Sequence, residues 1–309
     1  MVRAVERAAE IGADAMQVFS DNPTAWRRRS SLPAELPAFR RRLAELGIGP
    51  LAIHASYLVN LAGPDDELWD RSLAVLAHEL RTAESYGARL VNVHIGSHRG
   101  RGAAFGIDRV GEGVARVIEA VGDLAGWAGE AADGPRLVLE NSAGGGFGLG
   151  ATVEELALVL AAIDSHGVPR ERIGLCLDTA HLWGAGYRID ESAGLDTLLA
   201  AVDEQIGLDR VAMVHLNDSR AEPGSFSDRH QHIGAGRIGE AGLRAVVCHP
   251  ALAGATCYLE TPGMDEGYDA INLARVRDLI EGRALAALPE KDLEMRGSRA
   301  RTPPSGGED

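Results

Sequence analysis

Short apolar runs alternate along this chain with longer segments in which apolar residues recur every three or four positions. The runs are typical of strands buried on both faces, and the periodic segments of helices that cover a sheet. The runs predict strands at 15–19, 51–54, 90–94, 136–140, 173–178, 211–216 and 256–260. The periodic segments predict helices near 2–11, 35–47, 67–86, 108–131, 152–164, 193–206, 239–247 and 268–282.

This alternation, with no wide linker, favours a closed parallel barrel of the α/β class, a (β/α)8 TIM barrel, over a doubly wound sheet. No glycine-rich phosphate-binding sequence follows the first run, which also counts against a dinucleotide-binding fold. The strands are one short of eight, and the chain opens in a helix. We therefore expect this chain to lack the first barrel strand, which leaves the strands at 15–19 and 256–260 with unpaired edges.

The barrel is expected to form one domain over residues 1–287. From 288 to 309 the sequence has no apolar periodicity and many small or charged residues, which predicts a disordered tail. The start has no apolar signal segment, and no apolar run is long enough to span a membrane. Cys176 and Cys257 lie in apolar runs and are expected to be buried thiols, and the three cysteines form no paired motif, so we expect a cytoplasmic protein.

The chain carries a net charge of −14, which argues against a general nucleic-acid coat protein because phosphate binding usually needs a basic face. That objection weakens if many of the acids bind metal ions, since bound cations reverse the local field. We expect no membrane partner and no organic cofactor, and a monomer.

Six consecutive predicted strands end in a residue that can bind a metal or move a proton. These residues are His54, His94, Glu140, Asp178, His215 and Glu260, and His181 follows Asp178 closely. A lone histidine at a strand end is more often a hydrogen-bonded structural residue, and a lone aspartate is often a helix cap. Caps would favour Ser, Thr and Asn over His, so the recurrence favours one cluster at the barrel mouth.

The loop after His215 adds Asp218, Asp228, Arg229, His230 and His232. Asp228 and His230 are separated by one residue, which places both side chains on the same side of an extended loop. Imidazole and carboxylate ligands suit zinc, and manganese or iron also remain open.

The motifs IHASYLVNL, VNVHIGSH, LENSAGGG, LCLDTAHLWGAGY, VHLNDS, SDRHQHIGAG and YLETP together resemble the endonuclease IV family of abasic-site DNA repair enzymes, in the same order, from about residue 2 to 282. The resemblance implies three zinc ions per chain. It places His54 and His94 on the first zinc, with Glu140 bridging to a second that is completed by Asp178, His215 and Glu260. His181, Asp228 and His230 would hold the third. Through these metals, Glu140 and Glu260 would have catalytic roles.

The resemblance also implies the reaction and the partner. Incision of damaged double-stranded DNA on the 5′ side of an abasic site would leave a 3′-hydroxyl, and blocked 3′ ends could be trimmed. Asn22, Tyr57, Leu58 and Arg229 would contact DNA, and the arginines at 27–29 and in HRGR (98–101) would lie on the same face. Thr24 stands where family members often carry an intercalating arginine, and Ala235 stands where an acid is common, so the lesion range stays open.

Two other interpretations remain. A sugar isomerase or epimerase on the same barrel would need a single metal, which Glu140, Asp178, His215 and Glu260 could supply. A truncated relative could bind DNA or metal without turnover. About one metal per chain would favour the isomerase, and restoration of an upstream strand should raise the thermal stability if the barrel is incomplete.

Overall fold

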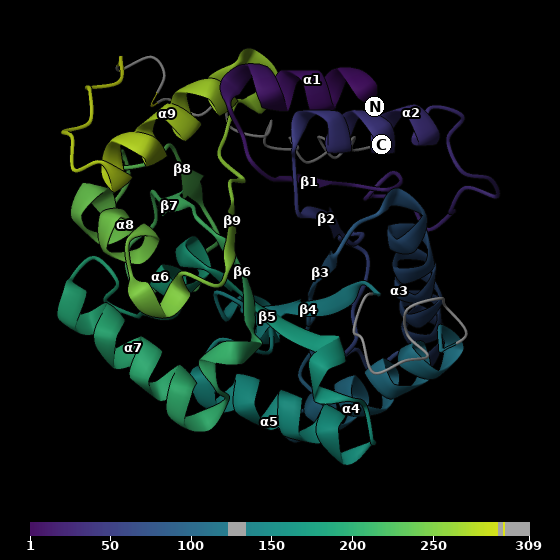
Figure 1. Cartoon of the computed structure of the whole chain (residues 1–309). Coiled ribbons are helices and arrows are strands. Elements are labelled where there is room, and N and C mark those ends of the chain that lie inside the picture. The colour runs from purple at the N-terminus through teal and green to yellow at the C-terminus, as the bar shows by residue number, and fades with distance from the viewer. Residues whose placement is uncertain (123–133, 290–292, 294–309) are drawn as a thin grey trace, which may run out of the picture.

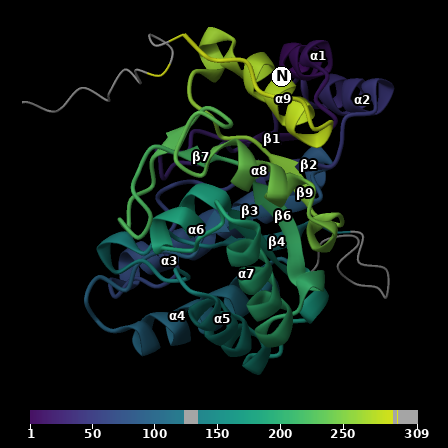
Figure 2. The ribbon, with the colours of Figure 1, turned by 90° about the vertical axis from the view of Figure 1, so that its left-hand side faces the viewer.

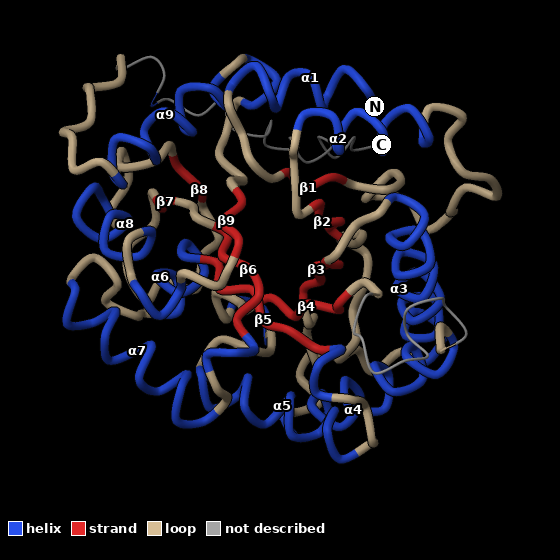
Figure 3. The backbone as a smooth tube through the Cα atoms, in the orientation of Figure 1, coloured by secondary structure: helices blue, strands red, loops and turns tan. Residues whose placement is uncertain are grey.

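The computed structural model describes residues 1–122, 134–289 and 293. Its main sheet is parallel and has seven strands in the order β1-β2-β3-β4-β5-β6-β9. The strands curve into an incomplete central ring, and the helices surround it (Figures 1 and 3). The strands are β1 (Met16–Val18), β2 (Leu51–His54), β3 (Leu90–His94), β4 (Arg136–Glu140), β5 (Ile173–Asp178), β6 (Val211–His215) and β9 (Thr256–Tyr258).

The helices follow the predicted segments closely. They are α1 (Val2–Ile11), α2 (Leu36–Leu46), α3 (Asp66–Tyr86), α4 (Ala103–Ala120), α5 (Val153–Ser165), α7 (Ser192–Gln205), α8 (Gly239–Val247) and α9 (Tyr268–Ile280). The α4 helix begins ahead of the predicted 108, directly after Gly102, whose φ of 99° is not helical. Part of the predicted 108–131 segment and most of the predicted tail lie outside the described residues.

Two small elements were not predicted. The α6 helix (Thr179–Ala185) follows β5 directly, and an antiparallel ribbon pairs β7 (Asp218–Ser219) with β8 (His230–Gln231). Both are too short for a period to be read from the sequence. Both lie at the ends of barrel strands, where they position functional side chains.

The apolar core has two parts. A small cluster fills the inside of the barrel, with Ala52, Val138, Cys176 and Met213 fully buried. A larger cluster packs the outer faces of the strands against the helices, as the all-apolar strand sequences predict. Figure 2 shows the barrel from the side, with α1 beside α9.

The barrel wall is open on one side. β1 and β9 are the two edges of the sheet, which confirms the prediction that the strands at 15–19 and 256–260 have unpaired edges. A cavity of about 1170 Å³ lies along this opening and reaches His54, His181 and Glu260. Cys257 lines it and is exposed, so the prediction of a buried thiol there was wrong, because the face of an edge strand lacks the cover that an inner strand has.

Candidate metal centre

The carboxyl ends of the parallel strands bring the predicted residues to one mouth. His94 of β3 lies beside Glu140 of β4, and Asp178 of β5 lies beside His215 of β6. Glu260 follows β9, which ends at Tyr258. In a parallel barrel all these strand ends face the same side, where loops build the active site.

The segment around Asp178 shows how the sequence builds the centre locally. Leu175 and Leu177 are buried, and the strand ends at Asp178, whose carboxylate caps α6 by accepting from the backbone N–H of His181 at 2.7 Å. Asp178 is therefore both a helix cap and a member of the cluster, because its second carboxylate oxygen points to the cluster. Since a helix advances by 3.6 residues per turn, His181 is brought back over Asp178.

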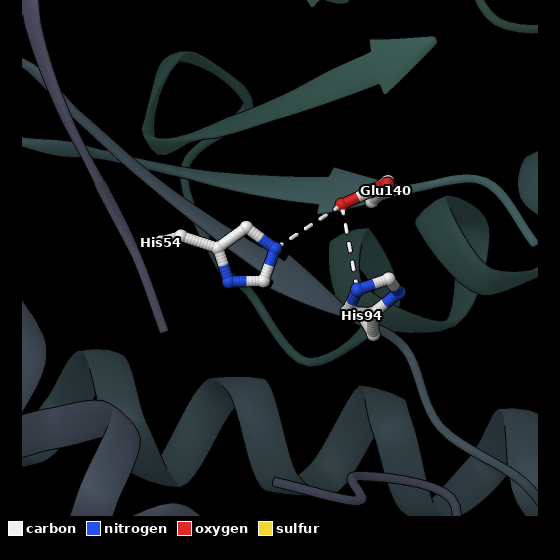
Figure 4. A group of neighbouring side chains, drawn as sticks. All are labelled: His54, His94 and Glu140. Atoms are coloured by element: carbon white, nitrogen blue, oxygen red, sulfur yellow. Dashed lines mark ion pairs between the residues drawn. The ribbon is translucent and has the colours of Figure 1, made fainter. Parts of the chain in front are cut away.

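The first group consists of His54, His94 and Glu140 (Figure 4). The Nε2 atoms of the two imidazoles lie 3.7 and 3.8 Å from the same oxygen, Oε2 of Glu140. His54 and Glu140 are buried, and His94 is partly exposed. Two ring nitrogens that converge on one carboxylate oxygen form a geometry in which a cation can be shared.

The second group shares Glu140 with the first. Glu140, Asp178, His215 and Glu260 bring their ligating atoms within 4.8 Å of one another. The Nδ1 atom of His215 lies 3.3 Å from Oε1 of Glu140 and 3.3 Å from Oε2 of Glu260. The two oxygens of Glu140 therefore face two different groups, as a bridging carboxylate requires.

The third group differs in one member from the predicted set. Asp178, His181 and His230 bring their ligating atoms within 4.8 Å of one another. Asp228, which was predicted in this place, lies at the outer side, 3.3 Å from Nε2 of His181 and 3.0 Å from Nε2 of His230. The structure thus brings all nine predicted side chains together, with Asp178 between the second and third groups.

Buried atoms without partners test whether metal ions fit here. Within the described residues, Oε1 of Glu140, Nδ1 of His215 and Nε2 of His230 are buried and accept or donate no hydrogen bond. A buried polar atom without a partner costs about 1–3 kcal/mol, so such a concentration needs an explanation. All three atoms are of the types that bind zinc, and all point into the groups described above. The residues fit divalent metal ions.

The charges of the cluster shift its pKa values. Burial alone would lower the pKa of His181, but the charges of Asp178, Asp228 and Glu140 outweigh it and hold that pKa well above the usual range. Burial likewise opposes protonation of His230, yet its ion pair with Asp228 at 3.0 Å and the charge of Asp178 raise its pKa to about 9. A metal ion must displace these protons when it binds, so its affinity is expected to rise with pH.

Three buried asparagines that were not predicted hold the predicted ligands in place. Asn92 donates to Oε2 of Glu140 at 2.5 Å, and Asn217 donates to Oδ2 of Asp178 at 2.6 Å. Asn141 accepts from the backbone N–H of Asp178 at 2.6 Å. Each lies one or two positions from a predicted ligand, and that short spacing is the signal that could have identified them.

Comparisons with known proteins decide the family. Residues 5–284 match the family described as xylose isomerase-like TIM barrel. A probable endonuclease 4 of Methanoculleus marisnigri is 40% identical over 277 residues, which cover 90% of this chain and 94% of that protein. One of Halorhodospira halophila is 41% identical over 288 residues, which cover 93% of this chain and 91% of that protein. The chain belongs to the endonuclease IV family.

The solved structures agree with this assignment. Endonuclease IV from Thermus thermophilus superposes with a TM-score of 0.76 at 40% identity, over 91% of this chain and 94% of that one. A D-tagatose 3-epimerase-like protein superposes with a TM-score of 0.65 at 16% identity, which shows a shared fold alone. The predicted barrel and family are confirmed, and the family makes this chain an enzyme of the nuclease class. Among the described residues, no helix is long and apolar enough to cross a membrane.

The predicted DNA-contacting residues of this endonuclease IV family member lie on loops around the mouth. Asn22, Tyr57 and Arg229 are exposed, and Leu58 is partly buried. Tyr57 donates its backbone N–H to the carbonyl of Pro23 at 3.1 Å, which ties the loop after β2 to the loop that carries Asn22. Their contact with DNA stays a prediction.

The two arginine clusters differ from each other. Arg28 is largely buried and pairs with Glu79 of α3 at 3.1 Å, so this arginine supports the loop instead of facing solvent. Arg29 pairs with Asp21. Arg99 and Arg101 are exposed and form no ion pair with the described residues.

Two exposed phenylalanines on other loops were also not predicted. Phe147, which follows β4, and Phe226, which precedes Asp228, have exposed fractions of 61% and 58%. Both adopt positive φ angles, 65° and 55°, which is uncommon for residues other than glycine. The Phe147 ring packs against His98 at 5.4 Å between ring centres, so the mouth is bordered by aromatic rings as well as cations.

Proposed function

We propose that this chain is a zinc-dependent AP endonuclease that cleaves duplex DNA on the 5′ side of abasic sites and leaves a 3′-hydroxyl. The observation that carries the proposal is the arrangement of nine ligating side chains as three overlapping groups that share Glu140 and Asp178. The relatives that share about 40% of its residues are named probable endonuclease 4. Three zinc ions per chain are proposed.

The residues of the centre form three proposed zinc sites. His54 and His94 with Glu140 would hold one zinc, while Asp178, His215 and Glu260 would complete a second site on the other oxygen of Glu140. His181, His230 and Asp228 would hold the third, with Asp178 facing it. When bound, zinc lowers the pKa of water and neutralises charge that develops on a phosphodiester in the transition state.

Side chains of the protein orient the proposed ligands and take part in the balance of protons at the centre. The asparagines fix the carboxylates Glu140 and Asp178 in the orientation that faces the metal groups, as outer partners of ligands do. Glu140 and Glu260 are proposed as catalytic residues because both face the space between the first and second groups. A separate general base is not needed in this arrangement.

The rim of the mouth fits a DNA substrate. The exposed aromatic rings, and Arg99 and Arg101 without ion pairs among the described residues, are features with which proteins hold unstacked nucleotides and phosphates. Tyr57 and Leu58 are proposed to enter the duplex beside the lesion, and Asn22 and Arg229 to contact the backbone. An abasic nucleotide is easily turned outward because no base has to be unstacked.

A sugar isomerase remains the competing function, because the group of Glu140, Asp178, His215 and Glu260 could serve its single metal. That function gives no role to His54, His94, His181, Asp228 and His230 as a set. Three metals per chain by elemental analysis would favour the nuclease, whereas about one would favour the isomerase.

The experiment that tests the function is the incision of a labelled duplex with one abasic analogue that resists β-elimination. We expect a nick on the 5′ side of the analogue, a product whose 3′ end a polymerase extends, and no nick in the undamaged duplex. Cleavage on the 3′ side, or equal cleavage of both duplexes, would contradict the proposal.

We also propose that residues 1–287 form the catalytic domain, that the enzyme works as a monomer, and that it resides in the cytoplasm. The location is supported by the cysteines Cys176, Cys248 and Cys257, all of which are free.

A further inference from the structure

Gln17 reaches from one edge of the open barrel to the metal centre. It lies in β1, and its side chain contacts two predicted ligands that belong to other strands or loops. Its Nε2 donates to Oε1 of Glu260 at 2.9 Å, and its Oε1 lies 3.1 Å from Nε2 of His215. β1 and β9 are not paired in the sheet, so this amide connects the two sides of the opening through side chains.

The chemistry of the amide fixes where the imidazole proton lies. An amide oxygen only accepts, so the hydrogen in the contact with His215 must be on Nε2 of the imidazole. The reversed amide would place its oxygen against the carboxylate of Glu260, where both groups would be acceptors. The orientation seen here is thus the one that satisfies both neighbours. It leaves the lone pair of His215 on Nδ1.

That lone pair faces the second group. Nδ1 of His215 is buried, lies 3.3 Å from one oxygen each of Glu140 and Glu260, and has no hydrogen-bond partner among the described residues. A neutral imidazole can bind a metal only through the nitrogen that carries no hydrogen, so the partner of the other nitrogen decides whether it binds.

Three other histidines of the centre are oriented differently. Nδ1 of His54 contacts the carbonyl of Ala55 at 2.7 Å, and Nδ1 of His230 contacts the carbonyl of Glu260 at 2.9 Å. Nδ1 of His181 contacts the carbonyl of Asn141 at 2.9 Å. In these three the backbone leaves Nε2 to face the centre, whereas His215 presents Nδ1 and depends on a side chain.

We propose that Gln17 is a positioning residue for the second metal site: it holds His215 in the tautomer that presents Nδ1 and orients the carboxylate of Glu260. The inference rests on the proposed function, because it assumes that this group binds a metal ion. Removal of an outer partner of a metal-bound histidine typically lowers metal affinity roughly 10- to 100-fold. Gln17 acts on two ligands of one site at once.

The test is Gln17→Leu, which keeps the volume near that of glutamine and removes both hydrogen bonds. Zinc retention is measured by titration of the zinc-loaded protein with a chelator. We expect one zinc per chain to be lost at roughly 10- to 100-fold lower chelator concentration than in the parent, with the others unchanged. Gln17→Glu, which restores an acceptor for His215 but no donor for Glu260, should recover part of the affinity.

A nitrogen-15 spectrum of the histidine rings gives a readout that a merely structural role would not move. In the zinc-loaded parent, His215 should show hydrogen on Nε2, and in Gln17→Leu this signal should weaken or broaden. Gln205→Leu, a glutamine replaced on the outer helix α7, is the matched control and should change neither readout.

The outcomes separate the two proposals. If the parent chain retains no zinc and does not nick abasic DNA, the proposed function fails. If the parent retains its zinc ions but Gln17→Leu releases them at the same chelator concentration with an unchanged ring spectrum, only the role of Gln17 is overturned. The role of Gln17 would also be overturned if Gln17→Leu lowered the melting temperature equally in the metal-free and the zinc-loaded protein. The amide would then only connect the two sides of the barrel opening.

Discussion

At the mouth of the barrel, single carboxylates contact several partners. Glu140 faces His54 and His94 with one oxygen and His215 with the other, and Asp178 both caps a helix and contacts the third group. Residue types and strand-end positions were enough to predict this cluster, because a parallel barrel places all carboxyl ends on one side. The sequence could not show which nitrogen of each imidazole faces inward, since that depends on partners such as Gln17.

The ion pairs of Asp228 should make the stability of the metal-free protein depend on pH. Burial opposes the protonation of His230, but the ion pair with Asp228 at 3.0 Å and the charge of Asp178 outweigh it and raise the pKa of His230 to about 9 from an ordinary value near 6.5. A group whose pKa is higher in the folded than in the unfolded protein stabilises the folded state fully at pH values below its unfolded pKa. This stabilisation disappears as the pH rises through the folded pKa. The free energy of unfolding of the chelator-treated protein should therefore fall between pH 6.5 and 9.

The variant Asp228→Asn tests whether Asp228 causes this pH dependence of the stability. Denaturant unfolding of both proteins at several pH values should give a smaller fall for the variant, because the amide carries no charge to hold the proton on His230. Equal slopes for the two proteins would show that Asp228 is not the source of the pH dependence.

At the scale of elements, the sequence predicted the strands almost to the residue, but it could not predict how the loops are anchored. Apolar runs have clear ends where a polar residue follows a buried one, as at His54 and Asp178. The loop after β1 looked like a basic surface. Arg28 instead enters the protein and meets Glu79 of α3, a contact between residues far apart in the sequence that no local pattern reports.

The Arg28–Glu79 pair is expected to hold that loop and its Asn22 in place. The side chains of Arg28 and Glu79 are only 9% and 2% exposed, so Arg28→Met would leave a buried carboxylate without its cation. Loss of one partner of a buried pair typically costs about 3–5 kcal/mol in the free energy of unfolding. Chemical denaturation of the variant should show a loss of that order.

Two control variants test whether the buried ion pair is the cause of this loss of stability. Arg27→Met, a neighbouring exposed arginine, should change the stability little, and Arg28→Met with Glu79→Met should regain most of the loss. A loss in Arg28→Met no larger than that in Arg27→Met would contradict a buried, stabilising pair.

At the scale of the whole molecule, the barrel fold and its open side both followed from the number and order of apolar runs. What the sequence did not predict is the effect of the opening on Cys257, which lies in an apolar run but lines the cavity between β1 and β9. Burial of a strand residue depends on whether its strand has neighbours on both sides, which is a property of the complete sheet.

Thiol labelling of the native protein should reveal this opening. Cys257 and Cys248 are exposed and Cys176 is buried inside the barrel, so a small thiol reagent should modify the first two and reach Cys176 only after unfolding. Cys257 should react more slowly than Cys248, because desolvation in the cavity raises the pKa of its thiol to about 11. Mass spectrometry of peptides locates the labels, and Cys257→Ser provides the reference. Protection of Cys257 equal to that of Cys176 would mean that the wall is closed in solution.

Whether the cluster at the mouth cleaves DNA at abasic sites is decided by the incision assay with His94→Ala. His94 meets Glu140 in the first group, and His166, exposed at the end of α5, provides the matched control. We expect the parent and His166→Ala to nick the abasic strand, and His94→Ala to lose nicking and one of three zinc ions but to stay folded. Nicking by His94→Ala at the parent rate would show that this cluster does not cleave the DNA.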